Sequence, residues 1–293
     1  MRNSRLVPQP DERGGLKMMD RPVWPGGKKC AAAVTVNLNA ELFWLALDPE
    51  CEKMPKTLSL GQYGMTRGLD RILEALESRG LKGTFFVPGW VCERYGGQIR
   101  DIAERGHEIA SLGYGNENMA LYTREEQKGL LEKSLKSIRE CCNVVPEGFR
   151  APDGELTEET LEIAAELGFT YSSSLHDDDR PYTRKAGNAA IVEIPIHWDN
   201  YDLPYFAFNY HPAFPAGQGR IMSYEGALSN WIDYFDGCRE YGLCYVFQTD
   251  PAASGSPGRI ELFEELLDHI ISFDDVWTAT CGEIQRYYMD NRR

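Results

Sequence analysis

Long apolar runs are missing from this 293-residue sequence. A membrane-spanning helix needs about 18 or more consecutive apolar residues, and no stretch here approaches that length. Near the amino terminus, Pro8, Pro10, Gly14 and Gly15 stand where a secretory signal would have its apolar core. We therefore expect a cytoplasmic protein that does not bind a membrane.

Positive charge is also scarce, with 31 Lys and Arg against 45 Asp and Glu and a formal net charge of -14. Nucleic-acid binding depends on clustered Lys and Arg that contact phosphates, so we expect a small-molecule ligand and no nucleic-acid partner. Residues 1–30 are the exception, with seven Lys and Arg against three Asp and Glu. We interpret them as a basic N-terminal arm that packs on an acidic neighbouring subunit, and so predict a homo-oligomer.

The eight cysteines include no C-x-x-C pair, and Cys141 and Cys142 are adjacent. This spacing indicates reduced thiols and not a disulfide framework. The sequence also lacks a glycine-rich phosphate loop, a G-x-S-x-G elbow and an H-E-x-x-H helix. These absences exclude the commonest signatures of nucleotide-binding enzymes, serine hydrolases and zinc peptidases.

Strand-like and helix-like segments alternate through the rest of the chain. The strand-like segments are short apolar runs bounded by Gly, Pro or polar residues, at 31–40, 83–90, 107–113, 148–152, 170–175, 191–198, 244–250 and 276–281. Thr123 fits the start of a helical capping box, and Gly168 fits the end of the next helix. The alternation predicts an α/β fold with a parallel sheet, which eight strands can close as a (β/α) barrel of TIM-like type. We expect one domain over residues 31–293, in which residues 199–222 are an irregular loop.

In such a barrel, reacting groups lie at the carboxyl ends of the strands and in the loops that follow. Polar residues crowd these positions: Asn37, Asn39, Glu41, Asn116, Glu117, Arg150, Asp153, His176, Asp177, Asp178, Asp179 and Asp250. Trp198 ends the sixth strand segment together with His197, and Tyr205 with Phe206 could form a lid over a pocket there. We interpret His107 as structural and regard His269 as incidental.

Five ordered motifs resemble those of the NodB-homology polysaccharide deacetylases. They are VTVNLNAELFW (34–44), GHEIASLGYGNENM (106–119), GFRAPDG (148–154), YSSSLHDDDRPY (171–182) and TDPAASGSPGRI (249–260). The similarity covers roughly residues 20–290 and is greatest to a cytoplasmic branch with allantoinase-like and cyclic-imidase-like members. It implies a distorted (β/α) barrel that hydrolyses a non-peptide amide, usually an N-acetyl group on a sugar.

The resemblance also implies site residues, and this sequence departs from most of them. The family holds a metal with one Asp and two His, and those positions carry Asn39, Leu112 and Asn116. The position of the base, an Asp in the family, carries Asn37, and the position of the late catalytic His carries Asp250.

Two further positions complete the implied site: Arg150 is retained, and Ser172 replaces the Asp that orients the catalytic His. Leucine has no lone pair, and a neutral Asn is a poor substitute for an anionic zinc ligand. Asn37 cannot accept a proton at neutral pH, so it is no general base. We therefore expect no bound metal and no other cofactor.

Several residues are candidates to replace the lost acid and base. Asp250 either takes over proton transfer or caps the loop 251–256 as an Asx-turn residue. Glu41 and Glu117 either act as bases near the pocket or bind backbone amides. His176 is either a base steadied by a neighbouring carboxylate or a solvated surface residue.

The other candidates bind substrate. Arg150 either binds a carboxylate or carbonyl oxygen of the substrate, or forms an ion pair with Asp250 or with the acidic residues 177–178. Asn37 and Asn39 each offer a donor and an acceptor, which suits a neutral, planar imide or ureide. The rest of the predicted substrate site is Glu41, Asn116, Trp198 and Tyr205.

Two functions of different classes follow. The first is metal-independent hydrolysis of a non-peptide carbon–nitrogen bond, with Asp250 or Glu117 moving the proton and Arg150 stabilising the oxyanion. The second is a catalytically inactive homologue that keeps the pocket to bind a small ligand or a partner. The substituted positions disfavour a third function, zinc-dependent deacetylation of an N-acetyl sugar.

Overall fold

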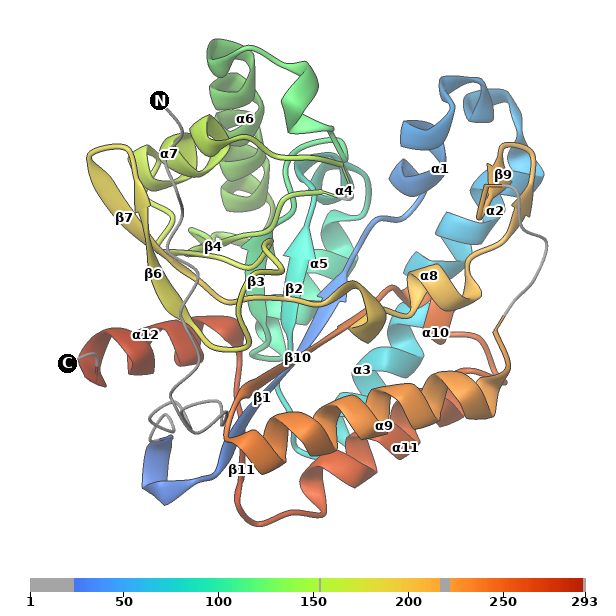
Figure 1. The fold of residues 1–293 in the computed structure, drawn as a ribbon. Helices are drawn as coiled ribbons and strands as arrows, with labels where there is room; N and C mark the ends of the chain where they lie inside the picture. Colours follow the sequence, from blue (N-terminus) through green and yellow to red (C-terminus); the bar gives the residue numbers. More distant parts are fainter. Residues whose placement is uncertain (1–23, 153, 217–221, 292–293) are drawn as a thin grey trace, which may run out of the picture.

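The eight predicted strand segments form one central sheet in the computed structural model, which describes residues 24–152, 154–216 and 222–291 (Figure 1). Their bounds are β1 (Cys30–Asn37), β2 (Thr84–Val87), β3 (Glu108–Ser111), β4 (Gly148–Phe149), β5 (Tyr171–Ser172), β7 (Ala189–Glu193), β10 (Cys244–Thr249) and β11 (Val276–Thr278). A further strand, β6 (Tyr182–Ala186), pairs antiparallel with β7, and all other pairs in this sheet are parallel. The prediction of an α/β fold with a parallel sheet is confirmed.

Within the sheet, the strands follow the order β10-β1-β2-β3-β4-β5-β7-β6, and β11 also pairs with β1. An isolated parallel bridge between Tyr201 and Gln248 joins the segment after β7 to β10. Since β10 begins the order and β7 lies near its end, this bridge brings the two sides of the sheet together, as the expected barrel requires.

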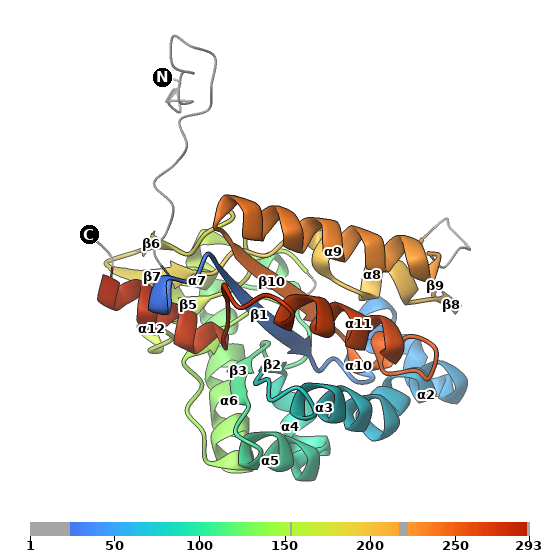
Figure 2. The same ribbon diagram turned by 90° about the horizontal axis from the view of Figure 1, so that it is seen from below.

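Helices connect the strands and cover the outer face of the sheet. The α-helices are α1 (Leu42–Leu47), α2 (Pro55–Tyr63), α3 (Leu69–Glu77), α4 (Gly89–Arg94), α5 (Gly96–Glu104), α6 (Arg124–Cys142), α7 (Glu158–Glu166), α8 (Leu203–Phe206), α9 (Tyr224–Tyr241), α10 (Pro251–Ser254), α11 (Ile260–Ile271) and α12 (Cys281–Asn291). Shorter helical turns are η1 (Pro25–Gly27), η2 (Pro49–Lys53), η3 (Gly64–Gly68), η4 (Met119–Leu121) and η5 (Trp198–Asn200). Figure 2 shows α3, α9 and α11 along the side of β1 and β10. Among the described residues, no helix is long and apolar enough to cross a membrane.

The strands β1 and β10 are buried on both faces, and their successive residues pack alternately into two apolar cores. Ala31 and Ala33 point inward and pack with Phe86, whereas Val34 and Val36 point outward against the covering helices. The inward alanines leave room for larger side chains from neighbouring strands. This apolar filling occupies much of the amino-terminal half of the interior, and the polar side chains of the cavity described below lie toward the carboxyl ends of the strands.

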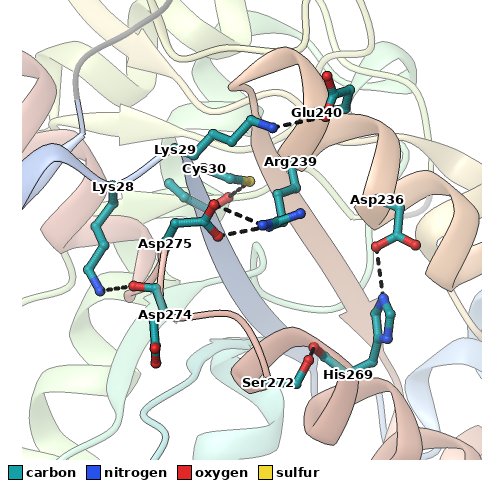
Figure 3. Close-up of polar contacts among 11 residues, drawn as sticks. Lys28, Lys29, Cys30, Asp236, Arg239, Glu240, His269, Ser272, Asp274 and Asp275 are labelled. Atoms are coloured by element: carbon teal, nitrogen blue, oxygen red, sulfur yellow. Dashed lines mark hydrogen bonds and ion pairs between the residues drawn. The ribbon is translucent and has the colours of Figure 1, made fainter.

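At the end of the sheet opposite the carboxyl ends of the strands, charged contacts fix the start of β1 (Figure 3). Lys29 forms an ion pair with Glu240 of α9 at 2.9 Å, and Arg239 holds Asp275, which precedes β11, through two bonds of 2.8 Å. His269 contacts Asp236 at 2.8 Å and joins α11 to α9, so its role here is a contact between two helices.

The structure differs from the sequence predictions at β6 and at residues 199–222. The strand β6 was not expected, because its residues alternate between exposed and half-buried positions and lack an apolar face. The expectation of an irregular loop at 199–222 is wrong in part: η5, α8 and the hairpin β8–β9 (Asn209–Tyr210, Ala213–Phe214) form there, and residues 217–221 lie outside the described ranges. Of the predicted basic arm, residues 1–23 also lie outside them.

Candidate functional site

A cavity of about 330 Å³ lies at the carboxyl ends of the parallel strands. Its polar lining consists of Asn37, Arg150, Glu155, Ser174, His176, Tyr201 and Gln248, from the ends of β1, β4, β5, β7 and β10 and the loops that follow them. These side chains come from distant parts of the sequence and meet because parallel strands bring their carboxyl ends to one edge. We refer to this space as the Arg150 cavity.

Arg150 is held from three directions at the inner end of the cavity. Its Nη1 donates to Thr35 Oγ1 and to Asn37 Oδ1, both at 2.9 Å. Nε donates to the Ser173 carbonyl and Nη2 to Ser173 Oγ, both at 2.8 Å. The guanidinium carbon lies 3.9 Å from the centre of the Phe86 ring. Described residues thus accept four of the five N–H bonds, and none of them accepts the remaining one on Nη2.

Within the described residues, which do not include Asp153, no carboxylate contacts the positive charge of Arg150. All its hydrogen-bond acceptors are neutral, and no carboxylate oxygen of the described ranges lies within 4.0 Å of its nitrogens. The ion pair considered with Asp250 or with residues 177–178 is therefore absent from this part of the chain. Burial lowers the pKa of Arg150 to about 10, which still leaves it charged at neutral pH.

His176 lines the same cavity from the loop after β5. Its Nδ1 lies 2.8 Å from the Ile196 carbonyl oxygen. A carbonyl only accepts, so in the neutral ring Nδ1 carries the proton and Nε2 keeps a lone pair. Glu193 fixes this loop, since its Oε1 accepts from the amides of Ser174 at 2.6 Å and Leu175 at 2.9 Å. The side chain of His176 is exposed, and its orienting partner is a carbonyl and not a neighbouring carboxylate.

Asp250 and Asn39 form a buried pair that does not line the Arg150 cavity. Asn39 Nδ2 donates to Asp250 Oδ2 at 3.1 Å and to Tyr201 Oη at 3.4 Å. The other oxygen, Asp250 Oδ1, accepts from the Ala252 amide at 2.7 Å and caps α10. This contact agrees with the Asx-turn interpretation of Asp250, and the Tyr201 contact links the pair to the cavity wall.

Asp202 binds the backbone amide of Asp250. The sequence analysis did not identify Asp202 as a site residue. Its carboxylate is fully buried and accepts from Thr249 Oγ1 at 2.6 Å, the Asp250 amide at 2.9 Å and the Ser254 hydroxyl. Burial raises the pKa of Asp202 to about 6, against the lowering effect of these hydrogen bonds. The signal was missed because all three partners lie more than 40 residues later in the chain.

Glu117 and Glu41 are engaged elsewhere. Glu117 accepts from the backbone amides of Tyr114 at 3.1 Å and Gly115 at 2.6 Å, which agrees with its structural interpretation. With Asn116, which adopts a left-handed backbone with φ of 62°, it lines a separate cavity of about 400 Å³. Glu41 accepts two bonds of 2.8 Å from the Tyr95 hydroxyl and one of 3.1 Å from an arginine of α4. Neither carboxylate lines the Arg150 cavity.

Of the two aromatic residues predicted for the substrate site, Trp198 lines the Arg150 cavity and Tyr205 does not. Trp198 is 68% exposed and lines the Arg150 cavity, where its ring is available to stack on a ligand. Tyr205 instead packs edge-on against Trp231, at 5.8 Å between ring centres, and donates to the Asp199 carbonyl at 3.0 Å. Phe206 is buried in the same cluster. The structure therefore brings Trp198 to the cavity and leaves Tyr205 and Phe206 in the packing of α8 against α9.

Four polar residues of the cavity were not predicted: Glu155, Ser174, Tyr201 and Gln248. Ser174 Oγ accepts from the Ala151 amide at 2.9 Å and so ties the loop after β5 to the loop after β4. Gln248 could have been found, because it is the one amide in the apolar strand β10 and shares the inward face with Val246. Tyr201 lies in the segment interpreted as a loop and carried no strand signal.

The metal that the resemblance implies does not fit the residues present. Leu112 lines the cavity with an apolar side chain, Asn39 donates its amide to Asp250, and Asn116 lies at a different cavity. Within the part of the chain that the structure describes, no group of three His, Cys, Asp or Glu side chains could hold a metal ion. The three residues at the family's metal positions therefore supply neither an imidazole nor a carboxylate, which zinc requires here.

A parallel α/β sheet with its polar cavity at the carboxyl edge is a common enzyme architecture, and comparisons with known proteins identify the family. Residues 61–172 match the family model described as "Polysaccharide deacetylase". A solved structure from Mycobacterium smegmatis, described as a "putative polysaccharide deacetylase", is 33% identical with a TM-score of 0.89, covering 93% of this chain and 94% of that one. The chain belongs to the polysaccharide deacetylase family.

Two other relatives extend the comparison. The peptidoglycan deacetylase of Helicobacter pylori is 28% identical over 284 residues, covering 88% of this chain and 95% of that protein. The solved structure of Puue allantoinase has a TM-score of 0.82 at 19% identity and covers 99% of both chains. At that identity, the second likeness concerns the fold alone.

Proposed function

We propose that this protein hydrolyses a non-peptide carbon–nitrogen bond in a small amide, cyclic imide or ureide without a bound metal. One observation carries the proposal. The buried guanidinium of Arg150, which no carboxylate of the described residues contacts, and the Nε2 lone pair of His176 belong to one cavity of about 330 Å³. A cavity of this size can hold a small ring.

In this proposal, Arg150 holds the oxygen of the scissile carbonyl. Negative charge develops on that oxygen when water adds to the carbonyl carbon, and a fixed guanidinium stabilises it with little reorganisation. The four bonds to Thr35, Asn37 and Ser173 keep the guanidinium in place before the substrate binds. Arg150 then serves as the oxyanion stabiliser.

His176 is the proposed base. Its Nε2 accepts a proton from the attacking water, and the same nitrogen returns that proton to the departing nitrogen when the carbon–nitrogen bond breaks. The Ile196 carbonyl keeps the ring oriented through Nδ1–H. Asp250 takes a positioning role in this scheme, since it holds Asn39 beside Tyr201 at the cavity wall.

The cavity lining favours a neutral, planar substrate. Asn37 and Gln248 provide amide donors and acceptors that complement an imide or ureide. Trp198 offers an exposed ring for stacking at the same cavity. A zinc-dependent N-acetyl sugar deacetylase has the least support, because Leu112 occupies one ligand position and supplies no lone pair.

A second candidate is a non-catalytic homologue that binds a small ligand. The observation in its favour is that both carboxylates expected to move protons are occupied by backbone amides. Asp250 binds the Ala252 amide, and Glu117 binds those of Tyr114 and Gly115. Under this candidate, the Arg150 cavity still binds carbonyl compounds but does not turn them over. Cytoplasmic location and homo-oligomeric assembly remain predictions under both candidates.

The substitution His176→Asn separates the two candidates, because Asn keeps a donor for the Ile196 carbonyl but has no basic nitrogen. We expect turnover to fall by about 100-fold or more, with the affinity for a cyclic imide retained in calorimetric titration. The matched control is His269→Asn, which removes a histidine between α9 and α11 and should leave turnover unchanged (Figure 3). Unchanged turnover in His176→Asn would exclude His176 as the base, and binding without turnover in the wild type would favour the second candidate.

A further inference from the structure

Three of the eight thiols gather where α4 packs against α6. Cys92 lies on α4, and Cys141 and Cys142 form the end of α6. Contacts on both sides fix the register of the two helices at this point. Ser137 Oγ donates to Glu93 at 2.7 Å, and Cys141 Sγ donates to the Gly96 carbonyl at 3.5 Å.

Within this cluster Cys92 belongs to the apolar core, Cys141 packs against that core, and each of the two thiols shifts the pKa of the other. Cys92 is buried, with 3% exposure, whereas Cys141 is half-buried at the end of its helix. A small solute can therefore reach Cys141, whereas Cys92 is shielded from solvent.

The surroundings of Cys141 favour its thiolate. Interaction with the Cys92 thiol and the charge of Arg100 lower the pKa of Cys141 to about 7, and Arg100 also donates to the Cys141 carbonyl at 3.2 Å. By contrast, burial raises the pKa of Cys30 and of Cys281 to about 12, so these thiols stay protonated in the interior. Because the thiolate is the reactive form, Cys141 is the thiol that should react first.

We propose that Cys141 and Cys92 form a redox-active pair, which peroxide converts into a disulfide linking α6 to α4. The Cys141 thiolate attacks one peroxide oxygen, the O–O bond breaks, and the product is a sulfenic acid with hydroxide, which takes up a proton to become water. The Cys92 sulfur then attacks the sulfenic sulfur, and the proton of Cys92 leaves with the departing oxygen as a second water. The two sulfurs lose two electrons in total, and the peroxide gains them.

Cys142 is a poor partner for Cys141 in this reaction. Adjacent Cα atoms are about 3.8 Å apart, which is shorter than the roughly 4.4–6.8 Å that disulfides usually span. In addition, Cys142 Sγ donates to the Ile138 carbonyl at 3.3 Å within its own helix, and burial raises its pKa. The disulfide should therefore cross between helices and not join neighbours.

Treatment of the full-length protein with hydrogen peroxide, followed by alkylation and peptide mass mapping, tests this pair. We expect the wild type to lose two hydrogen masses and two alkylatable thiols, with the peptides that carry Cys92 and Cys141 linked. In Cys92→Ser, a sulfenic acid on Cys141 should persist and form a dimedone adduct. Cys142→Ser is the matched control, and it should form the same disulfide as the wild type.

Three results would overturn the pairing: eight alkylated thiols after peroxide treatment, a bond between Cys141 and Cys142, or a bond between two chains. Near-ultraviolet circular dichroism before oxidation identifies a variant that fails to fold. The wild-type peptide map decides the question without any variant, since it reports which two peptides are joined.

Discussion

At the scale of single residues, the account depends on Arg150. The sequence left two roles open for this arginine, a contact with the substrate or an ion pair with an acidic residue, and among the described residues only neutral acceptors bond to it. Asn37 and His176 were likewise predicted at the cavity, because each follows directly from a strand end. Asp202 and Tyr201 were not, because their contacts depend on how residues 199–206 fold back on β10, which local sequence does not report.

Arg150→Lys tests the guanidinium directly. Lysine keeps the charge but cannot reproduce the planar set of contacts to Thr35, Asn37 and Ser173. Since a hydrogen bond to a charged group contributes about 1.5–3 kcal/mol, the affinity for hydantoin in calorimetric titration should fall by about 10- to 100-fold. Arg94→Lys is the control, because Arg94 pairs with Glu41 away from the cavity and should leave affinity unchanged. Equal affinities in both variants would contradict the role of Arg150.

His107 makes a prediction about pH. Burial lowers the pKa of His107 from 6.5 to about 4. As pH falls through 6.5, the unfolded chain takes up this proton while the folded chain does so only near pH 4, so His107 costs the fold stability across this window, by about 3 kcal/mol. The raised pKa of Asp202 acts in the opposite direction, because there the folded state binds its proton first.

Comparison of variants isolates the histidine from Asp202. Urea unfolding of the wild type and of His107→Asn at pH 7 and pH 4.5 should show a smaller loss of unfolding free energy in the variant on acidification. Asn can still accept the hydrogen bond that the Gly83 amide gives to His107 Nδ1. Identical pH dependence in the two proteins would show that His107 does not remain neutral in the folded state.

At the scale of elements, helix ends were the most readable feature. Thr123 and Glu126 form the predicted capping box of α6, and α7 is followed by Gly168 with φ of 93°, as its sequence indicates. These signals are local, and therefore a single sequence reports them. The strand β6 is stabilised by its antiparallel partner β7 and not by its own pattern, which explains why it was missed.

Thr123→Ala tests the strength of that cap. Removal of the hydroxyl leaves the Glu126 amide without its side-chain acceptor, and loss of such a cap costs about 1 kcal/mol. We expect chemical denaturation to show a decrease of this size in the free energy of unfolding. Thr66→Ala is the matched control, since Thr66 is exposed and bonds back to the Gln62 carbonyl within its own helical segment. A decrease of the same size in both variants would show that the capping box adds nothing specific.

At the scale of the whole molecule, the parallel sheet explains how the site forms. Its inward apolar filling closes the amino-terminal half, so the cavity is confined to the carboxyl edge, where strand-end rules place polar residues. The same rule also selected Glu41, Glu117 and Asp250, which the structure turns toward backbone amides or α4. Sequence reasoning therefore predicted the edge but not which side chains face the cavity, because side-chain direction depends on loops whose conformation the sequence does not specify.

The most direct test is turnover of succinimide, hydantoin, allantoin and N-acetylglucosamine, measured with and without a strong chelator. Our account predicts that a ring amide is hydrolysed and that its rate is unchanged after chelation, since the positions that hold the metal in the family carry Asn39, Leu112 and Asn116 where a zinc ion would need a carboxylate and two imidazoles. Turnover that chelation abolishes and zinc restores would contradict it.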